Sequence, residues 1–444
     1  MEIQSSERNI KTNLNKSENI SFIKEIKFKV KKTKKKCCCS KNFINLKKII
    51  ILIISIISII IFILILKLII SNLTNKSNIS SNFLNNNNQV IKLNPDIINI
   101  LKDKINDSFE KLGFVNINLI ESEIPGGRKY KQNKNKFKEV NVGVAIDSNV
   151  VLQSMFTICS LMDSQFIETK LRLHFAVIKF SVDNMLKIYT LREKIRDDVE
   201  FNFYNARKVE FDLSNFHPKG LGILGKYFLP ELLKDDVERI IIIDVGDVLV
   251  LRDLTEMYNW DMEDKIFCGT PDMGINRYSL ITRKPFEMYI NTGHYLVNVR
   301  KAKENKIYDK IVENKNLYTT SHYIDQDLFN DMARGQIGYL PFKFGINAPY
   351  DRDNVSDIYH FKTYYDFIAN VTQKEKYNFL PNNQDEMNAQ AFNPVIIHQW
   401  NGKWQDGSGL TIYRRIAQYY IKLAGIWDEM CYYYPGYCKK QTTT

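Results

Sequence analysis

The chain has 444 residues, 44% of them hydrophobic and 25% charged, which is ordinary for a globular protein and long enough for one large domain or two. Its formal net charge is +12, but residues 1–48 hold fourteen Lys and Arg against four Glu, so the remaining residues carry only +2. Charge concentrated in one short tail argues against a nucleic-acid-binding fold and for a cytosolic tail beside a membrane.

Residues 1–48 are rich in Lys and Asn and end near a basic run followed by Cys37, Cys38 and Cys39. These Cys are candidates for S-palmitoylation or thiols of no special role. Residues 49–70 are almost entirely apolar and long enough to cross a bilayer as a helix, with a buried core helix as the alternative. Because the Lys residues precede this segment, we expect a single-pass type II membrane protein with everything after about residue 70 across the membrane.

Residues 71–138 are expected to form a stem and linker, because they begin with an Asn- and Ser-rich stretch and end in a basic loop. Within them, residues 96–113 have the apolar spacing of a helix. Triplets that accept N-glycans on the far side of a membrane occur at Asn72, Asn75, Asn78, Asn106, Asn354 and Asn370.

Residues 139–444 are expected to form one α/β domain, because apolar strands alternate with helices along them. This alternation is typical of an α/β sandwich with a mainly parallel central sheet. Strands are expected at 140–147, 173–180, 201–213, 239–243, 266–269, 289–298 and 394–398, and helices at 150–162, 224–233 and 412–427.

The most informative strand is the Ile-rich run that ends in Asp244-Val245-Gly246-Asp247. A short run of β-branched residues indicates a strand buried on both faces, and its carboxylates then emerge at the ligand-binding edge of an open α/β sheet. Two carboxylates on one short turn favour a divalent ion that bridges to a substrate phosphate. The alternative is a buried strand followed by a plain Asp-Gly turn.

The Cys and aromatic residues of the domain give three further expectations. Cys431 and Cys438 flank a Tyr-rich loop that they can close as a disulfide in an oxidising compartment. The many Tyr and Trp after residue 400 either line a groove for stacking on a ligand or belong to the core. Cys159 and Cys268 are expected to be buried.

Several segments occur in a characteristic order: a strand ending in Asp147, the helix 225–233, the acidic turn, the Asn-Thr-Gly-His run within 290–298, Asp325-Gln326-Asp327, and Ile-Ile-His-Gln-Trp-Asn-Gly-Lys-Trp at 396–404. Together they resemble family 8 of the glycosyltransferases, which includes glycogenin, lipopolysaccharide galactosyltransferases and Golgi xylosyltransferases. The resemblance covers about residues 139–410. It implies a GT-A fold, a UDP-sugar donor, Mn²⁺ (or Mg²⁺), retention of the anomeric configuration, a glycan or glycoprotein acceptor, and a lumenal catalytic domain on a Golgi or ER membrane.

The resemblance also implies roles for individual residues of this chain. Ala145 and Asp147 match the positions that hold the uracil and ribose, and Lys226 falls where the family usually has an Arg that approaches the donor. Asp244 and Asp247 stand for the metal motif and His398 for the third protein ligand of the metal. Gly402 and Lys403 lie near the residues that meet the diphosphate. Asn291 and Gly293, with Asp325 and Gln326, match the surroundings of the transferred sugar.

Two spacings depart from the family pattern. The metal motif is one residue longer than Asp-x-Asp, so either Gly246 bulges and both carboxylates reach the ion, or only Asp247 binds it. Counting back from Arg252-Asp253-Leu254 favours Asp247. Gly402 also comes one place late after His398, which weakens the assignment of Lys403.

The chemistry of these residues agrees with the resemblance. A metal held by two carboxylates and one neutral imidazole suits Mn²⁺ more than Ca²⁺, and Lys403 adds positive charge where the departing UDP gains negative charge. Asp325 and Gln326 are assigned to positioning the sugar and stabilising positive charge at the anomeric carbon. Two other classes remain open: a haloacid-dehalogenase-like phosphatase, which also has two Asp after an apolar strand, and a catalytically inactive membrane-tethered lectin or scaffold.

Overall fold

The computed structural model describes residues 95–129, 138–206, 221–272, 289–318, 324–347, 384–391, 393–398 and 412–438. Gly402, Lys403, the predicted tail 1–48 and the predicted membrane segment 49–70 lie outside these ranges. Among the described residues, no helix is both long enough and apolar enough to span a bilayer.

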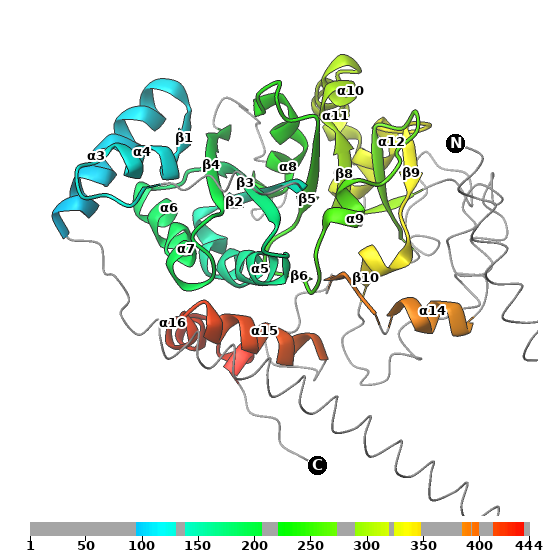
Figure 1. Cartoon of the computed structure of the whole chain (residues 1–444). Coiled ribbons are helices and arrows are strands. Elements are labelled where there is room, and N and C mark those ends of the chain that lie inside the picture. The colour runs from blue at the N-terminus through cyan, green and yellow to red at the C-terminus, as the bar shows by residue number, and fades with distance from the viewer. Residues whose placement is uncertain are drawn as a thin grey trace, which may run out of the picture. The chain divides into compact units, whose positions relative to one another are not determined.

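A twisted sheet forms the centre of the folded unit (Figure 1). Among the described residues it has eight strands in the order β1-β4-β3-β2-β5-β8-β7-β9, and a separate sheet has the order β10-β11-β6. The pairs β2–β3, β3–β4, β2–β5 and β7–β9 are parallel, whereas β1–β4, β5–β8 and β7–β8 are antiparallel. The prediction of a mainly parallel central sheet is therefore confirmed. The strands are β1 Phe114–Asn116, β2 Lys138–Asp147, β3 Thr169–Ile178, β4 Glu200–Asn205, β5 Arg239–Ile243, β6 Val248–Val250, β7 Phe267–Pro271, β8 Ile290–Asn298, β9 Ile337–Tyr339, β10 Ile346–Asn347 and β11 Ile396–His398.

Helices cover both faces of the sheet, and the core divides into two apolar clusters. Helix α5 packs with β6 and α15 in one cluster, and α8 packs with β2 and β3. The helices are α3 Pro95–Leu112, α4 Ile117–Glu123, α5 Val151–Ser164, α6 Val182–Tyr189, α7 Leu191–Lys194, α8 Leu221–Leu232, α9 Thr255–Tyr258, α10 Val299–Glu304, α11 Ile307–Asn314, α12 Ile324–Met332, α14 Gln384–Ala391, α15 Ile412–Leu423 and α16 Trp427–Tyr433.

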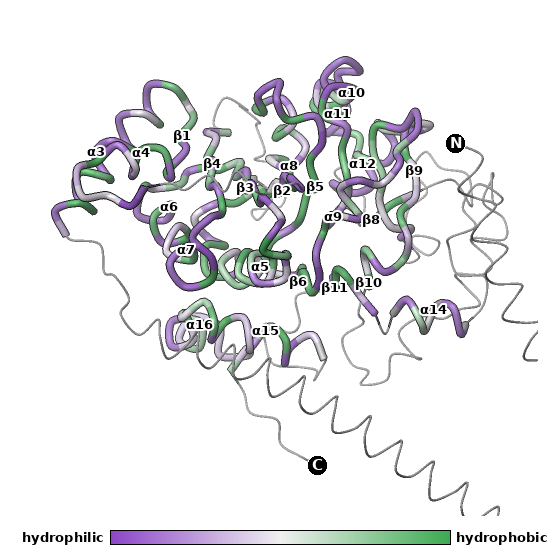
Figure 2. The backbone as a smooth tube through the Cα atoms, viewed as in Figure 1, coloured by the Kyte–Doolittle hydropathy of each residue, from purple (hydrophilic) through white to green (hydrophobic). Residues whose placement is uncertain are grey.

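Strand β5 has the buried character that its Ile run predicts. Ile240, Ile241, Ile242 and Ile243 are all at most 1% exposed, and they divide alternately between the two apolar clusters. After Arg239, β5 is hydrophobic, and much of α5 is hydrophobic as well (Figure 2). Because β5 is sandwiched between β2 and β8, the turn after it is fixed at the centre of the sheet's carboxyl edge.

The segment predicted as stem and linker is partly folded. Helix α3, strand β1 and helix α4 belong to the same compact unit as the sheet, which begins at Lys92. β1 extends the sheet at β4, and Asn116 Nδ2 donates hydrogen bonds to Glu200 Oε1 (2.9 Å) and Asn202 Oδ1 (3.0 Å). Glu121, fully buried, pairs with Arg192 at 2.9 Å. These buried polar contacts fix residues 95–129 to the domain, in a way that local composition did not reveal.

The C-terminal region differs from the single predicted helix at 412–427. It forms α15 and α16, because the backbone of Gly425 between them has a left-handed φ of +68° that ends the first helix. Cys431 and Cys438 form the predicted disulfide, with Cα atoms 5.4 Å apart. Cys159 and Cys268 are buried, as expected, and are not in a disulfide.

Candidate functional site

Strands β2, β5 and β7 each lead into an aspartate at or just past the strand's end. These are Asp147, Asp244 and Asp272, and all three are partly exposed. The Asp147 carboxylate accepts a hydrogen bond from the backbone N–H of Asn149 at 2.8 Å, which caps the short 3₁₀ turn that follows. Ala145 and Asp147 therefore lie at the edge where the sequence predicts the nucleoside.

The acidic turn is bulged at Gly246, whose φ is +91°. Its backbone N–H donates to Thr157 Oγ1 of α5 at 3.0 Å, and a Cβ at this position would lie 3.0 Å from Gln153 Cβ. Positive φ and close packing both favour glycine here. The extra residue of the motif is thus accommodated in the turn, which leaves Asp244 and Asp247 in different surroundings.

Asp244 is bound to Lys226 of helix α8. Lys226 Nζ lies 3.0 Å from each carboxylate oxygen of Asp244, 3.2 Å from Asp325 Oδ2 and 3.0 Å from the carbonyl oxygen of Thr292. The Lys226 side chain is buried. Burial alone would lower the pKa of Lys226, but the carboxylates of Asp244 and Asp325 raise it above its usual value. Lys226 therefore stays charged and connects Asp244 in the acidic turn to Asp325, which the sequence predicts to face the transferred sugar.

Asp247 faces His398 instead. Strand β11 pairs with β6 so that His398 lies opposite Val248, and His398 Nε2 is 3.4 Å from Asp247 Oδ2. Asp247 Oδ1 and His398 Nδ1 are buried and have no hydrogen-bond partner within the described residues. Burial would lower the pKa of His398, but the carboxylates, Asp247 first, raise it.

An oxygen and a nitrogen that are buried and unpaired make a suitable donor pair for a divalent cation such as Mn²⁺. Within the described residues, however, no group of three or more His, Cys, Asp or Glu side chains is arranged as a metal site. Of the three predicted ligands, the structure thus brings Asp247 and His398 together, while the nearest partner of Asp244 is an ammonium group.

Strand β8 supports His398 through two neighbouring residues. A Cβ at Gly293 would lie 2.5 Å from His398 Cε1, so only glycine leaves room for the imidazole. His294 is fully buried, with its ring edge-to-face against His398 at 5.6 Å between centroids and its Nε2 2.8 Å from Thr270 Oγ1. Burial, with the charges of His398 and Lys226, lowers the pKa of His294, so it is neutral. The sequence prediction missed His294, although a His inside an apolar strand was a visible signal.

A second network gathers the predicted sugar-side residues around Asp272. Asp272 Oδ2 accepts hydrogen bonds from Asn291 Nδ2 at 3.0 Å and Gln326 Nε2 at 2.9 Å. Asn291 Oδ1 accepts from the N–H of Gly293, and Gln326 Oε1 from the N–H of Thr292. The sequence therefore predicted three members of one network but missed its centre. Asp272 follows a strand as Asp147 and Asp244 do, which was the signal available.

The aromatic residues near the C-terminus divide between core and surface. Tyr413 and Tyr437 are buried, and the negative charge of Asp247 contributes to raising the pKa of both, so they lie close to the acidic turn. Tyr419, Tyr432 and Tyr433 are exposed. Tyr413 and Tyr437 are therefore core residues, whereas an acceptor groove formed by the other aromatic residues stays a prediction.

The arrangement of an acidic turn, a buried histidine and an amide network at one sheet edge agrees with the comparisons with known proteins. The sequence profile of glycosyl transferase family 8 matches residues 38–404. The chain belongs to glycosyltransferase family 8. A Haemophilus influenzae protein named as a glycosyltransferase is 30% identical over 180 residues, which cover 39% of this chain and 52% of that protein. The chain thus aligns with about half the length of that relative.

Solved structures add the fold of this family 8 member. The bifunctional glycosyltransferase WbbM matches with a TM-score of 0.50 and 14% identity, over 66% of this chain and 51% of WbbM. The galactosyltransferase LgtC in complex with donor and acceptor sugar analogues has a TM-score of 0.47 and 19% identity, over 65% of this chain and 95% of LgtC. Family membership, with the likeness to WbbM, supports a GT-A-like glycosyltransferase fold with a mainly parallel central sheet. Family membership also favours a glycosyltransferase over the phosphatase alternative.

Proposed function

We propose that the chain is a retaining glycosyltransferase that moves a sugar from a UDP-sugar to a glycan or glycoprotein acceptor, with Mn²⁺ as its metal. The observation that carries this proposal is the pair Asp247 and His398, whose buried Oδ1 and Nδ1 atoms have no hydrogen-bond partner in the described part of the chain and lie beside the Lys226–Asp244 ion pair. Such a pair is costly to bury unless a cation binds there. Mn²⁺ would stabilise the negative charge that develops on the departing UDP.

The residues of the site are proposed to bind the metal and to position the donor. Asp247 and His398 are proposed to hold the metal, and Asp244, positioned by Lys226, either completes this set or contacts the donor's ribose. Lys226 keeps Asp325 in place at 3.2 Å. Asp325 and Gln326 are proposed to position the transferred sugar and to stabilise positive charge at its anomeric carbon.

Ala145 and Asp147 are proposed to hold the uridine at the end of β2, and Asn291 and Gly293 to border the transferred sugar on β8. Gly402 and Lys403 are proposed to meet the diphosphate. These assignments follow the positions of family 8 motifs in this chain, and the described residues among them all lie at or beside the carboxyl edge of the central sheet.

The test is Mn²⁺-dependent UDP release by the purified chain from UDP-galactose, UDP-glucose and UDP-xylose. Asp247→Ala and His398→Ala should abolish release because each removes a direct ligand, and Asp244→Ala should cost at least about 10–100-fold, as loss of an outer-shell partner does. Asp309→Ala, which removes an exposed carboxylate on α11, is the control. Release by none of the proteins would favour the inactive lectin or scaffold, and near-normal rates for Asp247→Ala and His398→Ala would refute the metal site.

The proposed location is a Golgi or ER membrane, with residues 49–70 as a single-pass anchor and the catalytic unit in the lumen. The disulfide between Cys431 and Cys438 supports an oxidising compartment. In sealed vesicles, a tag at residue 1 should be digested by added protease while the catalytic unit is protected. Protection of the tag would reverse the proposed orientation.

A further inference from the structure

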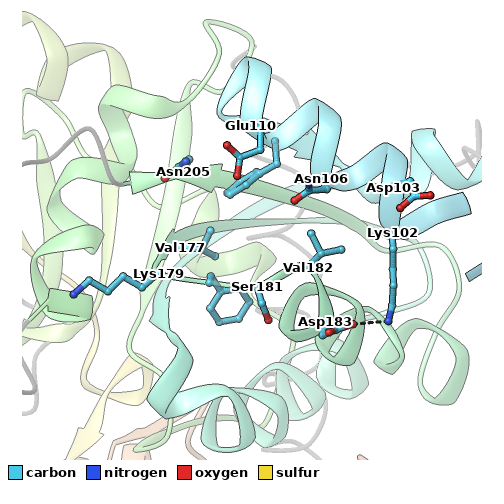
Figure 3. A pocket seen from close by; sticks show the side chains of 12 residues that line it. Lys102, Asp103, Asn106, Glu110, Val177, Lys179, Ser181, Val182, Asp183 and Asn205 are labelled. Atoms are coloured by element: carbon cyan, nitrogen blue, oxygen red, sulfur yellow. Dashed lines mark ion pairs between the residues drawn. The ribbon is translucent and has the colours of Figure 1, made fainter. Parts of the chain in front are cut away.

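A cleft of about 450 Å³ lies between helix α3, the carboxyl ends of β3 and β4, and the start of α6. This volume is within the range of about 300–1,000 Å³ typical of small-ligand sites. Figure 3 shows Asn106 and Glu110 on α3 on one side of the cleft, with Val177, Ser181 and Val182 on the other. The cleft exists because β1 attaches α3 to the sheet edge, so it depends on the N-terminal segment 95–129.

The cleft is separate from the proposed donor site. Asp147 at the end of β2 lies opposite Ile178 of β3, and Asn205 of β4 lies opposite Val177 of β3. Neighbouring strands are about 4.8 Å apart, so the cleft, which is lined by the ends of β3 and β4, lies one to two strand spacings from the end of β2. That displacement is on the side away from β5, whose acidic turn lies on the other side of β2. A molecule in the cleft would therefore not occupy the position proposed for the transferred sugar.

An exposed ion pair bridges one end of the cleft, and the chain at the other end has an unusual conformation. Lys102 Nζ of α3 and Asp183 Oδ1 of α6 form an ion pair of 2.6 Å. On the opposite side, Lys179 has a left-handed φ of +49° directly after β3, which is rare for a residue with a side chain. This kink brings Phe180 and Ser181 into the wall of the cleft. Local strain of this kind is concentrated at ligand-binding segments.

The lining combines apolar and hydrogen-bonding groups without a strong charge. Phe109 and Phe180 give apolar surface, while Asn106, Asn205 and Ser181 give amide and hydroxyl groups. Among the charged side chains that line it, three carboxylates accompany two ammonium groups, so a phosphate or other polyanion is disfavoured. Within the described residues, the side chains of Asn106 and Glu110 make no hydrogen bond or ion pair. Both are available to a ligand when the Asn106 triplet carries no N-glycan, which is the state that the test below fixes.

We infer that this cleft is a second carbohydrate-binding site, which takes a neutral oligosaccharide. Amides donate and accept at once, and carboxylates accept two hydrogen bonds, which matches the paired hydroxyls of a sugar. The C–H faces of a sugar ring contact aromatic and aliphatic side chains, such as those of Phe109, Phe180 and Val177. The inference does not require donor turnover, so it stands or falls separately from the proposed transferase reaction.

The experiment measures saccharide binding to the full chain in detergent micelles by saturation-transfer difference NMR. Lactose, maltotriose and chitotriose are the separate probes, and inorganic phosphate is the anionic competitor. All proteins carry Ser108→Ala, which removes the glycosylation triplet while keeping the Asn106 side chain. We expect at least one saccharide to show transfer, and phosphate not to displace it. Absence of transfer to all three saccharides, or displacement by phosphate, overturns the inference.

Matched variants on α3 assign the signal to the cleft. Asn106→Ala with Glu110→Ala should weaken saccharide binding on the order of tenfold, because two hydrogen-bonding groups are lost. Lys104→Ala with Asp107→Ala changes the same exposed helix away from the lining and should leave binding unchanged. Asp247→Ala should also retain the signal, since it affects only the proposed metal site. Equal binding by the Asn106/Glu110 variant and the Lys104/Asp107 variant overturns the assignment.

Discussion

Lys226 Nζ lies 3.0 Å from both carboxylate oxygens of Asp244, and the lysine side chain is buried under the carboxyl edge of the sheet. The ammonium group also reaches Asp325 and the carbonyl oxygen of Thr292. One side chain from helix α8 thus fixes the acidic turn after β5 relative to the start of α12. We regard Lys226 as the residue that sets the position of the acidic turn, with its predicted metal ligands, relative to Asp325 on the predicted sugar side.

Replacing Lys226 should destabilise the fold as well as reduce turnover. Lys226→Met keeps the length of the side chain but leaves Asp244 and Asp325 without their counter-ion. Because these carboxylates are 31% and 26% exposed, the cost should be below the value of about 3–5 kcal/mol for breaking a fully buried ion pair. Urea denaturation should show this loss. The double variant Lys226→Met with Asp244→Asn should recover part of it, because one uncompensated charge is removed. Equal stability of the single and double variants would contradict the ion-pair role.

The sequence was sufficient to predict the fold class, because β-branched runs such as 239–243 and their alternation with helices reflect burial directly. It was also sufficient to place Asp244, Asp325 and Gln326 at one edge. It was not sufficient to predict which partner each side chain selects. The Lys226–Asp244 pair joins residues 18 positions apart, and Asp272 contacts residues on two other elements. Such contacts depend on how the elements pack and have no local signature.

Gly246 should tolerate no side chain. Gly246→Ala places a Cβ at a φ of +91° and 3.0 Å from Gln153 Cβ, so strain and crowding add. Strained backbone of this kind costs about 1–3 kcal/mol, and the change should also shift Asp247 and weaken Mn²⁺ binding. Thermal unfolding and calorimetric titration with Mn²⁺ measure the two effects.

Gly335→Ala is the control for Gly246. Gly335 has a φ of +78°, but no atom of the described residues would lie within 4 Å of a Cβ there. It should therefore show the conformational cost alone and leave Mn²⁺ affinity unchanged. If both variants lost stability equally and Gly246→Ala kept its Mn²⁺ affinity, the packing of the bulge against α5 would be unimportant for the site.

His294 and Gly345 should be energetically coupled. A Cβ at Gly345 would overlap His294 Nε2, which now contacts Thr270 Oγ1, and the displaced ring would press on His398. Gly345→Ala should therefore lower stability by about 1–3 kcal/mol, as overpacking does, and weaken Mn²⁺ binding. In a double-mutant cycle, His294→Ala should partly restore both properties to Gly345→Ala. Strictly additive effects would show that His294 does not transmit the change.

His174 should make the folded state sensitive to acid. Its imidazole is fully buried, with Nδ1 3.0 Å from the Tyr204 hydroxyl and Nε2 3.0 Å from Asn141 Oδ1. Burial, with the charge of Arg172, lowers the pKa of His174 from 6.5 to about 3. Below pH 6.5 the unfolded chain therefore binds a proton that the folded chain does not, and the free energy of unfolding falls as the pH drops toward 3.

This contribution is absent above pH 6.5 and grows by up to about 1.4 kcal/mol for each pH unit below it. Carboxylates also titrate in this range. The informative quantity is therefore the difference in the free energy of unfolding between the wild-type chain and His174→Gln, which keeps a donor and an acceptor but cannot be protonated. Urea denaturation at pH 7, 6, 5 and 4 should show the wild type losing more stability than the variant at each step below pH 6.5. Parallel curves for the two proteins would mean that His174 accepts a proton without disturbing the fold, against the buried hydrogen-bonded arrangement with Tyr204 and Asn141.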